Sequence, residues 1–517
     1  MAVFELVLTL LLVGAVLAAL ARRFNVPYPA LLALAGAALA LLPDVPSVTL
    51  DPKLALTLLV APVLLDAAFD SSPRDLKRNW RAVTGLALAA VGLTIVAVAV
   101  VARAMIPGLP WPAAIALGAI VAPPDAAAAT AVLHQLRPPH RVLVILQGES
   151  LFNDASALLI YRVAVGAAVT GTFAGWRAVP ELAAVALGSV LLGAALSRIS
   201  IYISARIQDV PTAVIVQFLG TFAVWMLADR LGLSGIITVV VFAILVAREA
   251  PDLIPAKLRI QSYAVWEVVV FVLNVLAFIL IGLQLKPILG RLSRIELLTY
   301  ATAAAAVLAT VMVVRIVWVT LYAGIARWRG APINLRAASV VAWCGMRGIV
   351  TLAAALALPD GGSGSAPFPH RDFILFTAFC VVLGTLVIQG MTVRPLMRAL
   401  NLRDDGSVDR EVRLARAETA RAALDAVDGA GNDGEMIAFL RRKYQARLRR
   451  AEWEDGAPEP AESDGWRDFG NVQRHAYEEE RRVLSDLRAR GVIGDDAFHQ
   501  VEEELDWAEV NAETRQR

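Results

Sequence analysis

The sequence has 517 residues, of which 58% are hydrophobic and only 18% are charged. Soluble globular chains contain about 45–50% apolar and about 25% charged residues. The apolar excess is too large for one buried core, because a folded soluble protein still needs polar surface. Two cysteines, Cys344 and Cys380, are too few for a disulfide scaffold. The composition therefore predicts an all-α polytopic membrane protein.

The net charge of +2 conceals two regions of opposite sign. Residues 401–517 contain 19 basic and 28 acidic residues, whereas residues 1–400 contain 29 basic and 18 acidic ones. The long apolar runs also end near residue 400. We therefore expect a transmembrane domain in 1–400 and a mostly helical cytoplasmic tail in 401–517, with a flexible Gly-, Pro- and acid-rich linker near 454–465.

A helix needs about 20 mostly apolar residues to cross the hydrocarbon layer. Thirteen runs approach this length, and the second and ninth are short enough to be partial or re-entrant. The predicted spans are 2–21, 28–43, 52–69, 82–104, 111–134, 141–170, 178–204, 210–228, 232–247, 262–285, 296–326, 335–358 and 372–393.

The loops between these spans differ in basic charge, which predicts orientation because Lys and Arg concentrate on the cytoplasmic side. One alternating set, with the segment after the last span, contains eighteen Lys and Arg residues, and the other contains eight. This predicts an outer N-terminus and a cytoplasmic C-terminus in a bacterial plasma membrane. Lys286, Arg291 and Arg294 lie on the outer side against this trend. The first run has no basic residue before it, so we expect a retained anchor and not a cleaved signal peptide.

The fifth predicted span is interrupted by Pro123 and Pro124, followed by Asp125. Proline removes a backbone donor and disfavours helix in the residue before it. Two in succession should unwind the segment, leaving free backbone groups and a carboxylate near the middle of the bilayer. Irregular backbone at this depth is tolerated only inside protein or beside a water-filled cavity.

The twelfth predicted span contains Gly345, Arg347 and Gly348 at its middle and is the second candidate for a broken helix. The fifth and twelfth spans are seven apart, as two inverted six-helix repeats with one intervening span would place them. Interrupted segments in matching positions of two halves are typical of a transporter binding site. The alternative is a pair of ordinary helix kinks.

The sixth predicted span contains the densest polar group: Gln147, Glu149, Ser150, Asn153 and Asp154. Ser150, Asn153 and Asp154 are three and four residues apart and share one helix face. Ionisable residues inside a span usually face the bundle interior or a transport pathway. The alternative is a hydrogen-bonded cluster between helices.

Other polar residues inside the spans are weaker candidates. Asp66 lies deeper in the third span than Asp70, which can equally be a solvated helix end. Glu267 and Asn274 lie in the tenth span. Two arginines are expected to be structural partners or to snorkel to the interface: Arg162 and Arg315.

Several other chemistries lack their motifs. The sequence has no HExxH zinc site, no Walker A lysine motif and no CxxC pair. We therefore expect neither an enzyme nor a cofactor, and no nucleic-acid partner. A channel or receptor would explain the spans but not two matching interruptions around buried carboxylates.

Three motifs in this order, Gly148-Glu-Ser-Leu-Phe-Asn-Asp154, Pro123-Pro-Asp-Ala126 and Gly345-Met-Arg-Gly-Ile-Val350, resemble the signatures of bacterial monovalent cation:proton antiporters. The similarity covers about residues 1–400 and points to the Na⁺/H⁺ exchanger family. It implies exchange of Na⁺, Li⁺ or K⁺ for H⁺, and a dimer in which a six-helix core moves as an elevator in membrane lipid.

The resemblance also implies roles for particular residues. Asp154 matches the carboxylate that binds the cation and the proton in turn, and Ser150, Asp125 and Asn153 match residues around the same ion. Asp66 matches a family glutamate of the third span and is one methylene shorter. Transported Na⁺ is thus expected on Asp154, Ser150 and Asp125.

A structural ion pair between Glu149 and Arg347 is likewise implied by the family. Pro124 stands where the family usually has threonine, which removes a hydroxyl and a backbone N–H. Asn153 stands where electrogenic relatives have a second aspartate, so we expect one cation exchanged per proton with no net charge movement. The resemblance leaves a K⁺-selective antiporter open as an alternative.

Overall fold

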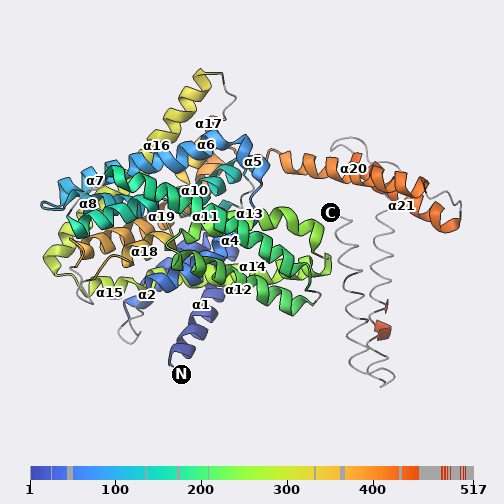
Figure 1. Ribbon diagram of the computed structural model, residues 1–517, viewed down its shortest axis with the longest axis horizontal. Coiled ribbons are helices and arrows are strands. Elements are labelled where there is room, and N and C mark those ends of the chain that lie inside the picture. The colour runs from blue at the N-terminus through green and yellow to red at the C-terminus, as the bar shows by residue number, and fades with distance from the viewer. Residues whose placement is uncertain are drawn as a thin grey trace. The chain divides into compact units, whose positions relative to one another are not determined.

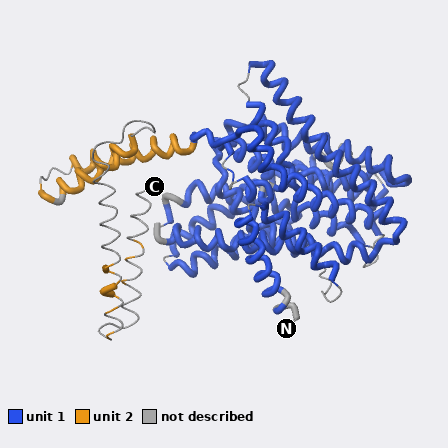
Figure 2. The backbone as a smooth tube through the Cα atoms, turned by 180° about the vertical axis from the view of Figure 1, so that it is seen from behind, with its two compact units in different colours: residues 1–407 blue, residues 408–517 orange. Residues whose placement is uncertain are grey.

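The computed structural model describes residues 2–452, except 25, 43–50, 134, 135, 137, 172–174, 208, 255, 331–333, 361–366 and 430–433, together with isolated positions between 479 and 507. The predicted linker at 454–465 lies outside the described residues. The chain divides into two compact units, residues 1–407 and 408–517 (Figure 2).

The described secondary structure is entirely helical (Figure 1). Its elements are α1 Ala2–Phe24, α2 Tyr28–Ala40, α3 Pro52–Ala55, η1 Leu56–Val60, α4 Ala61–Phe69, α5 Pro73–Arg78, α6 Trp80–Thr84, η2 Gly85–Ala90, α7 Val91–Met105, α8 Trp111–Val121, α9 Ala126–Leu133, α10 His140–Thr170, α11 Gly175–Ser204, α12 Val210–Arg230, α13 Gly235–Leu253, α14 Ala256–Leu283, α15 Leu285–Leu289, α16 Arg294–Trp328, α17 Leu335–Trp343, α18 Ile349–Leu356, α19 Arg371–Ala399, α20 Ser407–Asp428 and α21 Glu435–Glu452.

All thirteen predicted spans fall on helices, and both predicted breaks are present. The fifth span divides into α8 and α9, and the twelfth divides into α17 and α18. Among the described residues, nine stretches are long and apolar enough to cross a membrane, and α2 and α8 are shorter apolar helices. The all-helical membrane fold is therefore confirmed, while the number of crossings and the inverted repeats stay predictions.

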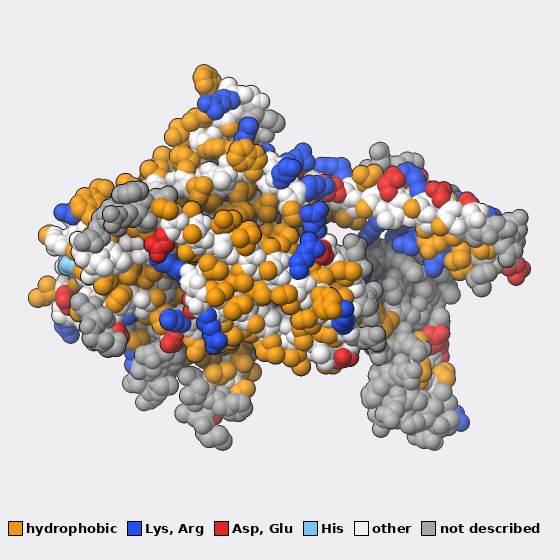
Figure 3. Space-filling view, in the orientation of Figure 1, with side chains coloured by type: hydrophobic (Ala, Val, Ile, Leu, Met, Phe, Trp, Pro, Cys, Tyr) orange, Lys and Arg blue, Asp and Glu red, His pale blue; other side chains and the backbone are white. Residues whose placement is uncertain are grey.

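The surface of the first unit is unusually apolar, with orange side chains over much of the face in Figure 3. Large apolar residues such as Leu12, Leu191 and Leu298 are more than half exposed on their helices. A soluble monomer rarely exposes a contiguous apolar patch above about 600 Å². Such a surface is suited to contact with lipid.

Helices α2 and α14 pack so closely that their backbones touch. A Cβ atom on Gly282 would lie 2.2 Å from the carbonyl oxygen of Ala33, and one on Gly36 would lie 2.3 Å from that of Ile279. Only glycine permits this approach. The contact fixes α14, one wall of the cavity described below.

A polar cluster joins the short helix α5 to the start of α10. His140 Nε2 lies 3.3 Å from Asp75 Oδ2, and Arg141 Nε donates to Asn79 Oδ1 at 3.0 Å. Partial burial raises the pKa of Asp75, but hydrogen bonds from His140, Ser72 and Arg74 outweigh it and hold this pKa below its usual range. These contacts anchor the start of α10, the helix that carries the motif of the sixth predicted span.

The basic residues on the predicted outer side also have local partners. Lys286 Nζ donates to the carbonyl of Leu42 at 3.2 Å, just beyond the end of α2. Arg291 lies 3.8 Å from Asp372 at the start of α19. The carbonyl end of a helix attracts a cation such as Lys286, and Arg291 pairs with a carboxylate, so two of the three residues that run against the loop-charge trend have local partners.

Replacing Gly282 by Val should push α2 and α14 apart, because no flexible side chain can yield at a backbone contact. We expect a destabilisation of about 1–3 kcal/mol, the usual cost of overpacking. Thermal unfolding of the detergent-purified protein measures it. Gly220→Val on α12 is the matched control, since nothing lies within 4 Å of its Cβ position; equal melting temperatures for the two variants would contradict the prediction.

Candidate functional site

The two broken helices cross at their unwound segments. Residues 122–125 separate α8 from α9, and residues 344–348 separate α17 from α18. The backbone N–H of Asp125 donates to the carbonyl of Met346 at 2.7 Å and joins the two segments. Pro123 and Pro124 have no N–H to offer, which explains why the helix breaks here.

The Asp125 carboxylate occupies the start of α9. Its Oδ1 accepts the Ala127 N–H at 2.9 Å, so it binds a backbone donor that a helix start leaves unpaired. Its other oxygen rests on Gly348, where a Cβ atom would lie only 1.5 Å from Oδ2. Gly348 is thus required for space, and Asp125 lies beside the first residues of α18.

Arg347 binds the carbonyls at the end of α8. Its Nε donates to Val121 O at 3.0 Å and its Nη2 to Ala122 O at 3.1 Å, while Nη1 donates to Gly345 O. Carbonyls at a helix C-terminus lack partners within the helix and carry partial negative charge. A fully buried guanidinium therefore satisfies the end of a broken helix inside the protein.

The predicted ion pair between Glu149 and Arg347 is wrong in its second member. Glu149 instead binds Arg315 of α16 in a bidentate pair, with Nη1–Oε1 at 2.5 Å and Nη2–Oε2 at 2.8 Å. Arg315 also donates to Val341 O at the end of α17. The expectation that Arg315 is a structural partner is confirmed. Arg347 binds the backbone carbonyls of Val121 and Ala122 because α8 ends beside it.

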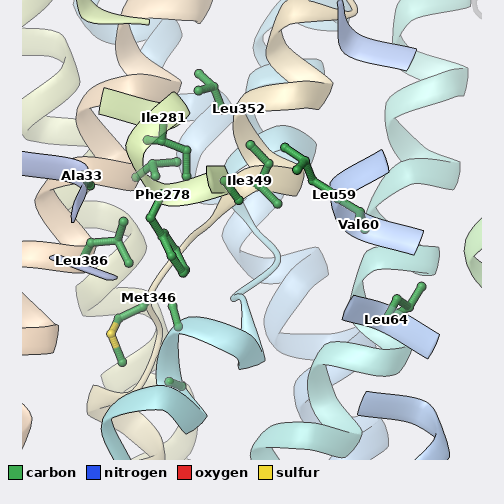
Figure 4. Packing of buried hydrophobic residues seen from close by; sticks show 14 of the residues in the cluster. Ala33, Leu59, Val60, Leu64, Phe278, Ile281, Met346, Ile349, Leu352 and Leu386 are labelled. Atoms are coloured by element: carbon green, nitrogen blue, oxygen red, sulfur yellow. The ribbon is translucent and has the colours of Figure 1, made fainter. Parts of the chain in front are cut away.

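A cavity of about 60 Å³ lies beside the crossing. Its polar lining comprises Asp125, Asp154, Ser150, Gln147 and Asn274. The remaining wall is apolar and is formed largely by η1, α4 and α14, with the start of α18. Figure 4 shows Leu59, Val60 and Leu64 descending one side, with Phe278 and Ile349 nearby. The volume accommodates a dehydrated cation with a few waters.

The structure brings together three of the five residues predicted to bind the ion: Asp154, Ser150 and Asp125. Asn153 faces away from the cavity and donates from Nδ2 to the Pro124 carbonyl at 3.2 Å. It thus fastens α10 to the unwound segment.

Asp66 is not part of the lining within the described chain; it interacts electrostatically with Asp70 and Glu267. The side chain of Asp66 is one methylene shorter than the glutamate usual in the family, and it also lies outside the cavity lining. Asn274 lines the cavity but was not assigned to it from sequence. The sequence indicates this position only by a polar amide side chain within an apolar run.

Residues 7–399 match the family described as sodium/hydrogen exchanger, transmembrane. This chain belongs to the sodium/hydrogen exchanger family. The match covers nearly all of the unit 1–407, which contains the crossing and the cavity. Family membership makes it a transport protein of the antiporter class.

Similar proteins extend over most of the chain. The uncharacterized Na⁺/H⁺ exchanger Rv2287 of Mycobacterium tuberculosis is 31% identical over 527 residues, covering 98% of this chain and 96% of the relative. A Bacillus pumilus protein named sodium, potassium, lithium and rubidium/H⁺ antiporter is 29% identical, covering 92% and 73%. The sodium proton antiporter MjNhaP1 of Methanocaldococcus jannaschii has the same fold, with a TM-score of 0.63 at 19% identity over 77% of this chain and 98% of that one.

The ion-pair assignment predicts which arginine is energetically coupled to Glu149. Breaking a buried pair by removing one partner costs about 3–5 kcal/mol. We expect Glu149→Leu and Arg315→Leu each to lower the melting temperature strongly, and the double variant to lose much less than their sum.

The matched control is a second double-mutant cycle, in which Arg347 takes the place of Arg315 as the residue tested against Glu149. Glu149→Leu combined with Arg347→Leu should show a smaller coupling energy than the Glu149–Arg315 cycle, since Arg347 hydrogen-bonds to carbonyls and interacts with Glu149 only electrostatically, without a hydrogen bond. Larger coupling to Arg347 than to Arg315 would contradict the assignment. Thermal unfolding in detergent measures both cycles.

Proposed function

We propose that this protein exchanges a monovalent cation, Na⁺ in the first place, for H⁺ at Asp154. The observation that carries the proposal is the cavity in which Asp154, Asp125 and the Ser150 hydroxyl converge. Carboxylate and hydroxyl oxygens suit hard cations such as Na⁺.

Competition for one site is sufficient for exchange. Burial of Asp154, which is 6% exposed, and the neighbouring Asp125 both disfavour a bare negative charge. The Asp154 carboxylate is therefore stable when it holds a proton or a cation, and its ionised form without a bound cation is unfavourable. Each ion displaces the other, and no separate gate for each is required.

Alternating access follows in this proposal from movement of one group of helices against another. The carboxylates lie on α9, α10 and the adjoining segments, while η1, α4 and α14 form the facing apolar wall. We propose an elevator motion of the first group along this wall. The protein would act as a homodimer in the bacterial plasma membrane, with its N-terminus outside, its C-terminus in the cytoplasm and a role in pH homeostasis.

The cation range is part of the proposal. The name of the Bacillus pumilus relative includes potassium, lithium and rubidium, and oxygen ligands alone do not select one ion size. A K⁺-selective antiporter is therefore the second candidate. Dye-monitored pH change in everted vesicles, with a series of alkali chlorides at equal concentration, distinguishes the two.

Replacing Asp154 by Asn should abolish exchange, because the amide keeps the shape but can neither hold the proton nor balance the cation charge. We expect cation-driven pH change in proteoliposomes to fall to the background of empty liposomes. The purified variant should elute as the wild type does in size-exclusion chromatography. Retained exchange would refute the assignment of Asp154.

Exchange should be electroneutral, because Asn153 adds no second titratable charge to α10. We expect the Na⁺-dependent proton flux in liposomes under one fixed K⁺ gradient to be the same without valinomycin and with it, when the ionophore imposes a potential of about 100 mV that would apply about 2.3 kcal/mol to each transferred charge. A flux that follows the sign of the potential would exclude one-for-one exchange.

A further inference from the structure

Asn274 occupies an exceptional position in the cavity. It lies on α14, whereas the carboxylates and Ser150 belong to the unwound fifth span and α10. The wall of η1, α4 and α14 otherwise contributes apolar side chains: Leu59, Val60, Val63, Leu64, Ala67, Ala277 and Phe278. Asn274 is the one polar side chain on this wall among the described lining residues.

The Asn274 amide has unused hydrogen-bonding capacity. Within the described part of the chain it makes no hydrogen bond, although its side chain is half-buried in an apolar helix. Burying an amide without a partner costs free energy. By contrast, Gln217, an amide on neighbouring α12, accepts a hydrogen bond from Trp266 at 3.2 Å. Because Asn274 lines the cavity, the ion or water that the cavity holds can supply a partner for its amide.

The chemistry of an amide distinguishes the two transported ions. Its oxygen is a hard ligand for an alkali cation, as are carbonyl oxygens in other cation sites. An amide does not titrate in the physiological range, so it does not bind a proton there. Asp154 serves both ions, whereas Asn274 favours one.

We propose that Asn274 is a cation ligand supplied by the wall opposite Asp154, and that it raises the affinity for the cation without raising that for the proton. The inference rests on the proposed exchange at Asp154 and adds a residue that sets the balance between the two ions. Loss of this ligand weakens the binding of the cation, so the proton displaces the cation from Asp154 at a higher pH.

The test replaces Asn274 by Leu, which has similar volume and no ligand oxygen. In proteoliposomes we expect the half-saturating Na⁺ concentration to rise about tenfold, the effect of one lost polar interaction. At saturating Na⁺, the pH of half-inhibition by protons should rise by about one unit, because tenfold weaker cation binding tolerates tenfold fewer protons. The maximal rate at alkaline pH should stay within about twofold of wild type.

Two further variants sharpen the test. Asn274→Asp keeps the oxygen but adds a titratable charge, so we expect a lower half-saturating Na⁺ concentration at alkaline pH and a steeper loss of exchange on acidification. Gln217→Leu removes an amide outside the cavity and should leave both the half-saturating Na⁺ concentration and the pH profile at their wild-type values.

Binding can be measured if Asn274→Leu transports too slowly. Na⁺ that binds the folded state stabilises it by an amount that grows with the logarithm of one plus the ratio of the Na⁺ concentration to Kd, and so raises the melting temperature. The Na⁺ concentration that produces the same shift in melting temperature should then be about tenfold higher than in wild type.

A lower maximal rate with unchanged half-saturation and pH profile would show a purely structural role and overturn the inference, leaving exchange at Asp154 intact. Wild-type protein without saturable, proton-coupled Na⁺ flux would overturn the proposed function itself.

Discussion

The fold depends on how the protein satisfies three of the helix ends that the two breaks create inside an apolar medium. Breaking α8–α9 and α17–α18 leaves backbone donors and acceptors without partners where water cannot replace them. Arg347 and Arg315 bind carbonyls at the ends of α8 and α17, and Asp125 binds a donor at the start of α9. Each of these charges is therefore held by backbone dipoles, and Arg315 is held by the Glu149 carboxylate as well.

This neutralisation determines what the cavity can do. Glu149 is only five residues from Asp154, yet its bond to Arg315 makes it part of the scaffold. Asp125 is held by the α9 backbone on one side and faces the cavity on the other. Asp154 lacks a basic partner among the described residues. The carboxylate left without a fixed counter-charge is the one suited to exchanging a proton for a cation.

In our proposal, the facing wall adds selectivity to a site whose charges serve both ions. Apolar side chains of η1, α4 and α14 limit water and keep the electrostatic interactions in the cavity strong. The π-helical turn at η1 places Leu59 and Val60 in this wall, in keeping with the frequent occurrence of such turns at functional sites. A single amide on such a wall can change the cation affinity while leaving the carboxylates untouched.

The sequence alone determined the helical class, the positions of the spans, both breaks and the grouping of Ser150 with Asp154. These depend on local properties: apolar length, the missing proline N–H and the helical repeat. Only the tertiary structure decided that Arg315 and not Arg347 pairs with Glu149, that Asn153 and Asp66 lie outside the cavity lining, and that Asn274 belongs to it. Those outcomes depend on which helix ends and side chains meet across hundreds of residues, and spacing along one helix does not specify such contacts.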